Sequence, residues 1–224
     1  MAGHDTGAPA RVARFTLTER LLHWIIAASF FAMLVTGAFL YFPMLAQYLA
    51  RPTAKSVHLW AAIVMFASVP LVPLLGNRRA VAQSVHDVQW FDSDDVVWLT
   101  GAPSRLLARP HLDPPPQGRF NAGQKLNTVI SAGLLCVLGI TGLLLWLGER
   151  DTSYRLAGSV AVHDLTSVVI VFLVFGHMYL AMVHPSTRHA MRGMITGKVD
   201  RGWATEHHAK WLAELDAESD PAGR

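Results

Sequence analysis

Four long segments of mostly apolar residues alternate with polar stretches along the chain. A helix of about 20 apolar residues, rising 1.5 Å per residue, crosses the roughly 30 Å hydrocarbon layer of a membrane. The pattern predicts spans at about residues 18–42, 56–76, 124–148 and 159–183. It divides the chain into a tail (1–15), a membrane domain (16–183) and a polar C-terminal tail (184–224). The predicted fold class is an all-α integral membrane protein.

The basic residues predict the orientation of these spans. Four spans place both termini on one side of the membrane. The two short loops on the other side hold Arg51, Lys55, Arg150 and Arg155, and the remaining 15 of the 19 Lys and Arg residues lie in or beside the tails and the connection 78–125. Because basic residues are retained in the cytoplasm, both termini and this connection are predicted to be cytoplasmic, in the inner membrane of a bacterium.

Composition narrows the class of protein and the metal chemistry. Of the 224 residues, 52% are hydrophobic and 16% are charged, whereas soluble domains carry about 25% charged residues. A soluble globule and a disordered chain are therefore excluded. The one cysteine, Cys136, cannot supply a CxxCH haem attachment or a thiolate metal site. Any tightly held metal would use the eleven histidines.

Four of these histidines fall in the spans, where ionisable residues are costly and indicate function: His23, His58, His163 and His177. His163 and His177 are 14 residues apart, hence ~21 Å along one helix and within ~40° of the same face. By depth, His23 matches His177 near the cytoplasm and His58 matches His163 on the far side. Facing neutral imidazoles form an axial ligand set for haem b. The pattern predicts a four-helix bundle holding two b-type haems.

Other readings of these histidines are weaker. A proton relay would recruit carboxylates, and only Asp164 approaches the membrane; no HExxH zinc motif is present. Small residues would let a macrocycle approach the helices, although helix packing also favours them: Gly37, Gly133, Gly139 and Gly142. Basic residues near the expected haem edges would pair with propionates or anchor the interface: Arg20, Lys125 and Arg155.

The third span begins with the sequence Asn-Ala-Gly-Gln-Lys at residues 121–125. Asn121 as N-cap and Gln124 three residues later predict a capping box, and Thr16 with Glu19 predicts the same for the first span. A second reading is that Asn121, the Gly123 backbone and Gln124 donate hydrogen bonds to a quinone carbonyl. Spacing alone leaves both readings open.

Two polar regions are less informative. The connection 78–125 contains apolar residues at Val96–Leu99 and at Leu106 and Leu107 around a polar turn. They predict one short amphipathic helix on the cytoplasmic surface, followed by a proline-rich return at Pro114–Pro116. The C-terminal tail carries Trp203 and Trp211 and the adjacent pair His207 and His208, which suggests a membrane-surface or partner contact more than a metal site. We find no internal repeat by inspection.

The sequence resembles a known family in three places: the motif at residues 121–125, the run His177-Met178-Tyr179, and the tail pattern Gly-Met-Ile-x-Gly-Lys-Val followed by Trp-Ala and His-His. These motifs look like the gamma (cytochrome b) subunit of membrane-bound formate dehydrogenases, over roughly residues 14–211. The connection 78–125 and residues 45–56 match weakly. The histidine placement alone also suits the cytochrome b subunits of hydrogenases and thiosulfate reductases.

The resemblance implies the site residues and partners. His23 and His177 would ligate the cytoplasmic-side haem, and His58 and His163 the periplasmic-side haem. Asn121, Gly123, Gln124 and His177 would bind menaquinone or ubiquinone. Electrons would come from a molybdenum or tungsten catalytic (alpha) subunit through an iron–sulfur (beta) subunit on the periplasmic side. The expected partners include membrane lipid and no nucleic acid, and a higher oligomer is left open.

The predicted function is therefore an electron-transfer and quinone-reducing subunit with no activity of its own toward formate. A membrane anchor without haem is the alternative from a different class.

Overall fold

The computed structural model describes residues 10–101 and 114–219. In this part of the chain, four helices are long and apolar enough to span a membrane: α1 (Leu17–Tyr41), α2 (Arg51–Leu75), α6 (Ala122–Gly148) and α7 (Ser159–Met182). These helices confirm the predicted all-α membrane fold. Helix α2 begins at Arg51, five residues before the predicted start, because Pro52 fits the first turn, where its missing N–H has no partner to lose.

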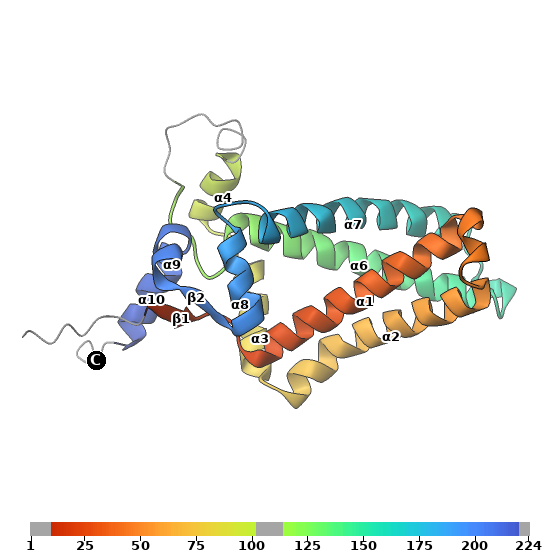
Figure 1. Ribbon diagram of the computed structural model, residues 1–224, viewed down its shortest axis with the longest axis horizontal. Coiled ribbons are helices and arrows are strands. Elements are labelled where there is room, and N and C mark those ends of the chain that lie inside the picture. The colour runs from red at the N-terminus through yellow and green to blue at the C-terminus, as the bar shows by residue number, and fades with distance from the viewer. Residues whose placement is uncertain (1–9, 102–113, 220–224) are drawn as a thin grey trace, which may run out of the picture. The chain divides into compact units, whose positions relative to one another are not determined.

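The described chain divides into two compact units. The first unit is residues 15–83 with 194–197, and the second is the rest of the described chain. In the first unit, α1 and α2 pack as an antiparallel hairpin joined by the 3-10 turn Pro43–Gln47 (Figure 1). In the second unit, α6 and α7 form the corresponding hairpin, joined by residues 149–158, which include the short 3-10 turn Thr152–Tyr154.

Helix α1 starts with the predicted capping box. The N–H of Glu19 donates to the Thr16 hydroxyl (3.4 Å), and the Glu19 carboxylate accepts from the N–H of Thr16 (2.7 Å). One residue before Glu19, the hydroxyl of Thr18 accepts from the N–H of Asn77 (2.9 Å). Polar side chains at the start of the helix therefore fix where α1 begins and where the chain leaves α2.

Residues 194–197, from the C-terminal part of the chain, bind the start of α1 in the first unit. Arg20 and Trp24 of α1 both donate side-chain hydrogen bonds to the carbonyl of Met194 (3.2 and 3.1 Å). Gly197 follows with φ +82°, and a Cβ there would lie 2.7 Å from the carbonyl oxygen of Phe15. Only glycine fits this left-handed, closely approached position. Helix α8 (Met191–Thr196) leads into this segment.

The connection between α2 and α6 contains two described helices where the sequence predicted one. Helix α3 (Arg78–Gln89) follows α2 after a two-residue turn, and α4 (Ser93–Thr100) holds the expected Val96–Leu99 stretch. Asp92 caps α4, because its carboxylate accepts from the N–H of Asp95 (3.0 Å) and the Asp95 carboxylate accepts from the N–H of Asp92 (3.1 Å). This local cap separates α4 from α3. The rest of the predicted amphipathic segment lies outside the described residues.

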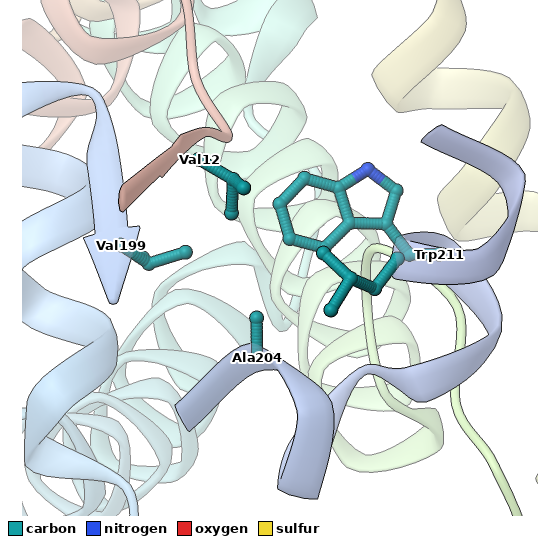
Figure 2. Close-up of a cluster of buried hydrophobic side chains, with 5 residues drawn as sticks. Val12, Val199, Ala204 and Trp211 are labelled. Atoms are coloured by element: carbon teal, nitrogen blue, oxygen red, sulfur yellow. The ribbon is translucent and has the colours of Figure 1, made fainter. Parts of the chain in front are cut away.

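A polar module in the second unit joins both ends of the chain. It comprises β1 (Arg11–Ala13), residues 114–121, β2 (Lys198–Asp200), α9 (Arg201–His207) and α10 (Ala209–Ser219). Strands β1 and β2 pair antiparallel, with Val12 opposite Val199. These two side chains pack with Ala204, Trp211 and Leu212 in a small buried core (Figure 2).

A buried cation and a buried imidazole tie this module to the start of α6. Arg14, 4% exposed, donates to the Arg119 carbonyl (2.6 Å) and to Oε1 of Gln124 (3.3 Å). Burial and the Arg119 charge lower the pKa of Arg14 to about 9, so the guanidinium stays protonated at neutral pH. His208 is fully buried and donates from Nδ1 to the Gly118 carbonyl (2.7 Å). Burial, with the Arg14 charge, lowers the pKa of His208 to about 3.

Candidate functional site

His58 and His163 sit in equivalent positions in the two hairpins. In the first hairpin, Nδ1 of His58 lies 3.0 Å from the hydroxyl oxygen of Thr36 on α1. In the second, Nδ1 of His163 lies 2.9 Å from the hydroxyl oxygen of Thr141 on α6. Both pairs are 22 residues apart in the sequence. Each hairpin therefore places one imidazole against a threonine of its neighbouring helix.

A glycine follows each of these threonines and lies under the same imidazole. A methyl group at Gly37 would lie 3.6 Å from Cε1 of His58, and one at Gly142 would lie 3.4 Å from Cε1 of His163. These distances are ordinary van der Waals contacts, so a side chain larger than a methyl group would displace either ring. No atom lies within 4 Å of a methyl group placed at Gly133. Gly37 and Gly142 therefore each lie against a histidine ring, whereas the space beside Gly133 is open.

His23 and His177 lie at the opposite ends of the same hairpins. His23 is in the second turn of α1, and its ring meets Trp24 edge-on with centroids 5.3 Å apart. Helix α7 is continuous from Ser159 to Met182, so His177 lies ~21 Å along its axis from His163. Each hairpin therefore carries one of these histidines near its closed end and one near its open end.

The basic residues expected near haem propionates contact protein groups. The Arg20 guanidinium donates to backbone carbonyls of α8, and the Arg155 Nε donates to the Gly148 carbonyl (2.8 Å). Lys125 forms an ion pair with Asp95 of α4 (Nζ–Oδ2 2.6 Å), and Nζ also donates to the Trp90 carbonyl (2.9 Å). Each of these three side chains therefore has a protein partner, and their pairing with haem propionates stays a prediction.

The capping box at the start of α6 is present as predicted. Oδ1 of Asn121 accepts from the N–H of Gln124 (2.9 Å), and Oε1 of Gln124 accepts from the N–H of Asn121 (3.1 Å). Arg14 donates to the same Oε1 (3.3 Å). Because both side-chain oxygens are engaged, the NH₂ group of each amide is the end directed away from the cap. Within the described residues, no acceptor faces either NH₂ group.

The backbone at Gly123 adds a third donor at this place. Of the first four N–H groups of α6, only that of Gly123 has no acceptor among the described residues. The acceptors for the other three are Gln117 Oε1 (2.7 Å from Ala122 N), Asn121 Oδ1 (2.9 Å from Gln124 N) and Asn121 O (3.0 Å from Lys125 N). Helix N-termini also carry partial positive charge. Three hydrogen-bond donors therefore gather within one turn.

Helix α4 forms one wall beside these donors. A methyl group at Gly123 would lie 3.0 Å from Cη2 and 3.1 Å from Cζ3 of the Trp98 indole, so the indole rests directly on the backbone of α6. The ion pair between Lys125 and Asp95 holds α4 in this position, and both side chains are buried (10% and 2% exposed). Position 123 therefore requires a residue without a side chain for packing against Trp98, in addition to supplying an N–H donor.

Comparison with known proteins identifies the family. The family model for prokaryotic cytochrome b561 matches residues 14–197, which include the four spans and the segment ending at Gly197. The chain belongs to this family. As a cytochrome b561 it is a multi-pass membrane protein of a prokaryotic helical-bundle family, and the family implies haem b.

Relatives of this cytochrome b561 cover nearly its whole length. It is 25% identical to the cytochrome b556(Fdn) subunit of the nitrate-inducible formate dehydrogenase of Escherichia coli strain K12, over 92% of each chain. It is also 25% identical to the cytochrome b556(fdo) subunit of an E. coli K12 formate dehydrogenase, over 91% of this chain and 93% of that one. For the formate dehydrogenase cytochrome b556 subunit of Haemophilus influenzae, the identity is 24%, over 91% and 83%. The resemblance read from the motifs is confirmed.

The residues present fit the haem that the cytochrome b561 family implies. Haem b needs neutral imidazoles and no covalent thioether. His58 and His163 each have Nδ1 engaged by a threonine, so Nε2 is the nitrogen that would ligate iron. The glycine beside each ring keeps bulky side chains away from it.

Sequence reasoning missed Thr36 and Thr141, although a signal for them exists. The pattern Thr-Gly, twenty residues, His occurs at 36–58 and again at 141–163. The two hairpins therefore share this local pattern of three residues. Trp98 and Asp95 were also missed as site residues, and no short-range spacing connects them to residues 121–125.

Proposed function

We propose that the chain is the dihaem cytochrome b subunit of a formate dehydrogenase complex, and that it carries electrons from the outer side of the membrane to quinone near the cytoplasmic side. The observation that carries this proposal is the matched placement of the histidines. Each hairpin supplies one histidine at each depth, and His58 and His163 share the same threonine and glycine surroundings. A membrane anchor would need no such repetition.

In this proposal each haem takes one ligand from each hairpin. His58 and His163 would hold the haem on the periplasmic side, and His23 and His177 would hold the haem on the cytoplasmic side. Haem b bound there supplies a reversible one-electron couple. The chain itself would orient the imidazoles of His58 and His163 through Thr36 and Thr141, which contact their Nδ1 atoms.

The quinone site is proposed at the start of α6. Quinone carbonyl oxygens accept hydrogen bonds, and this turn presents three donors: the NH₂ groups of Asn121 and Gln124 and the N–H of Gly123. The capping box orients both amides, and Arg14, the residue after β1, further restrains Gln124. His177 completes the proposed site from α7. The quinone, menaquinone or ubiquinone, would take its protons from the cytoplasm.

The orientation and the partners complete the proposal. The distribution of Lys and Arg supports cytoplasmic termini, with the short loops facing the periplasm. There an iron–sulfur subunit would dock and receive electrons from a molybdenum or tungsten catalytic subunit. The similarity to three formate dehydrogenase subunits supports this complex over the other candidate, a hydrogenase or thiosulfate reductase cytochrome b.

Haem counting tests the proposal directly. The purified chain should contain two haems b by the pyridine haemochrome assay. Replacing His58 or His163 by Ala should remove one haem, and replacing His23 or His177 by Ala should remove the other and abolish quinone-linked electron flow. His86→Ala is the matched control, because this exposed histidine of α3 lies outside the spans, and it should keep both haems.

Two results would reject the dihaem proposal. One is a wild-type chain that stays free of haem after reconstitution, which would favour the membrane anchor. The other is quinone-linked electron flow that persists in His177→Ala. The catalytic subunit that co-purifies with the chain separates formate dehydrogenase from the other respiratory complexes.

A further inference from the structure

Thr36 and Thr141 have more than one hydrogen bond, and the second one determines the direction of the first. The Thr36 hydroxyl lies 2.7 Å from the carbonyl oxygen of Ala32, one turn earlier in α1. The Thr141 hydroxyl lies 2.8 Å from the carbonyl oxygen of Val137 in α6. A carbonyl oxygen only accepts hydrogen bonds, so each hydroxyl donates its single proton to a backbone carbonyl of its own helix.

The threonine oxygens must therefore accept from the imidazoles. Nδ1 of His58 and of His163 carries the proton and donates to Oγ1, at 3.0 and 2.9 Å. In a neutral imidazole the other nitrogen is then unprotonated. Nε2 of both rings is left with a lone pair, which is the form that binds iron. The two hairpins reach this state independently, each through its own threonine.

Both hydroxyls lie in positions where water cannot easily replace them. Thr36 is 5% exposed and Thr141 is 8% exposed. Hydrogen bonds in a low-dielectric interior are stronger than in water, and linked bonds polarise one another. The chain from imidazole to hydroxyl to helix carbonyl is such a link. It pulls the Nδ1 proton away from the ring and makes Nε2 more basic.

We propose that Thr36 and Thr141 are a matched pair of positioning residues that fix the tautomer and orientation of His58 and His163 and lower the reduction potential of the outer haem. This inference rests on the proposed function, because it assumes that these histidines ligate iron. A more basic axial ligand stabilises ferric over ferrous iron, and hydrogen bonds to metal-bound histidines tune metal sites in this way. Loss of either bond therefore raises the potential.

The test uses the full chain in its complex, with the single replacements Thr36→Val and Thr141→Val, which keep side-chain volume and remove the hydroxyl. Outer-shell replacements of this kind cost about 10–100-fold in metal affinity. If ferric binding weakens tenfold more than ferrous binding, the outer haem's potential rises by about 59 mV. Redox titration and the low-spin EPR signal of the outer haem measure the change, and the inner haem reports that the chain is folded.

Two further variants separate the hydroxyl from packing. Thr36→Ser and Thr141→Ser keep the hydroxyl and should restore the wild-type potential and EPR signal. Thr128→Val is the control, because Thr128 makes the same backbone bond in α6 (2.8 Å to the Gln124 carbonyl) with no histidine contact among the described residues. It should leave the outer haem unchanged.

The supporting result is a raised potential, or selective loss of the outer haem, in the Val variants, with recovery in the Ser variants. A Val variant with wild-type potential and spectrum overturns the inference. So does a Ser variant as impaired as its Val counterpart, or a Thr128→Val variant with the same shift. These outcomes differ from failure of the proposed function, which appears as missing haem in the wild-type chain.

Discussion

Removal of the buried ion pair between Lys125 and Asp95 should destabilise the packing of α4 on α6. Nζ and Oδ2 lie 2.6 Å apart, and the two side chains are 10% and 2% exposed. Deleting one partner of a buried pair leaves an uncompensated charge and costs about 3–5 kcal/mol. At about 2–4 °C per kcal/mol for a chain of this size, Lys125→Met or Asp95→Asn should lower the Tm by roughly 6–20 °C.

The double variant distinguishes charge burial from simple loss of contacts. Asp95→Asn combined with Lys125→Met leaves no buried charge at this contact. The carboxamide oxygen introduced by Asp95→Asn can still accept from the N–H of Asp92, as the Asp95 carboxylate does now (3.1 Å). The loss of stability in the double variant should be smaller than the sum of the two single losses by about 1–3 kcal/mol. Thermal unfolding in detergent, followed by tryptophan fluorescence, measures all three variants.

A neighbouring ion pair provides the control. Lys210 pairs with Asp92 at the same N-cap, but the two side chains are 40% and 32% exposed. Exposed pairs contribute about 0–1 kcal/mol, so Lys210→Met should shift the Tm by only a few degrees. Additive losses in the double variant, or single variants no less stable than Lys210→Met, would refute the reasoning.

Two further predictions concern the start of α6 and the polar module. Gly123→Ala should press a methyl group against the Trp98 indole (3.0 Å to Cη2), reduce the stability of the fold by about 1–3 kcal/mol and raise the KM for quinone. The double variant Gly123→Ala with Trp98→Phe should recover the wild-type KM. An unchanged KM in the single variant would count against α4 as a wall of the site. The pKa of His208 is held near 3 in the folded chain, so as the pH falls the unfolded chain binds a proton before the folded chain does. The free energy of unfolding should therefore fall by about 1.4 kcal/mol per pH unit between about pH 6.5 and the folded-state pKa of about 3. His208→Asn keeps a donor for the Gly118 carbonyl without titrating, so denaturant titrations at several pH values should show a flatter dependence, and an equally steep one would contradict the assignment.

The parts of the site that depend on local spacing could be predicted from the sequence. The capping boxes of α1 and α6 join residues three apart, and one helical turn brings such residues together in any context. The positions of His163 and His177 along α7 follow from the constant rise of a helix. The contact between Lys125 and Asp95 spans 30 residues and two helices, so no periodicity indicated it.

The sequence by itself determined that the chain has four apolar helices long enough to cross a membrane, and that His163 and His177 lie ~21 Å apart along one of them. The reason is that burial in lipid demands long apolar helices and that helices have a fixed rise. Only the tertiary structure decided what each histidine touches. The rotation of α1 against α2, and of α6 against α7, brings a threonine hydroxyl to Nδ1 and a glycine under the ring. The tertiary structure also decided that Val12 pairs with Val199, far away in the sequence, because strand pairing in the polar module depends on packing that local sequence does not encode.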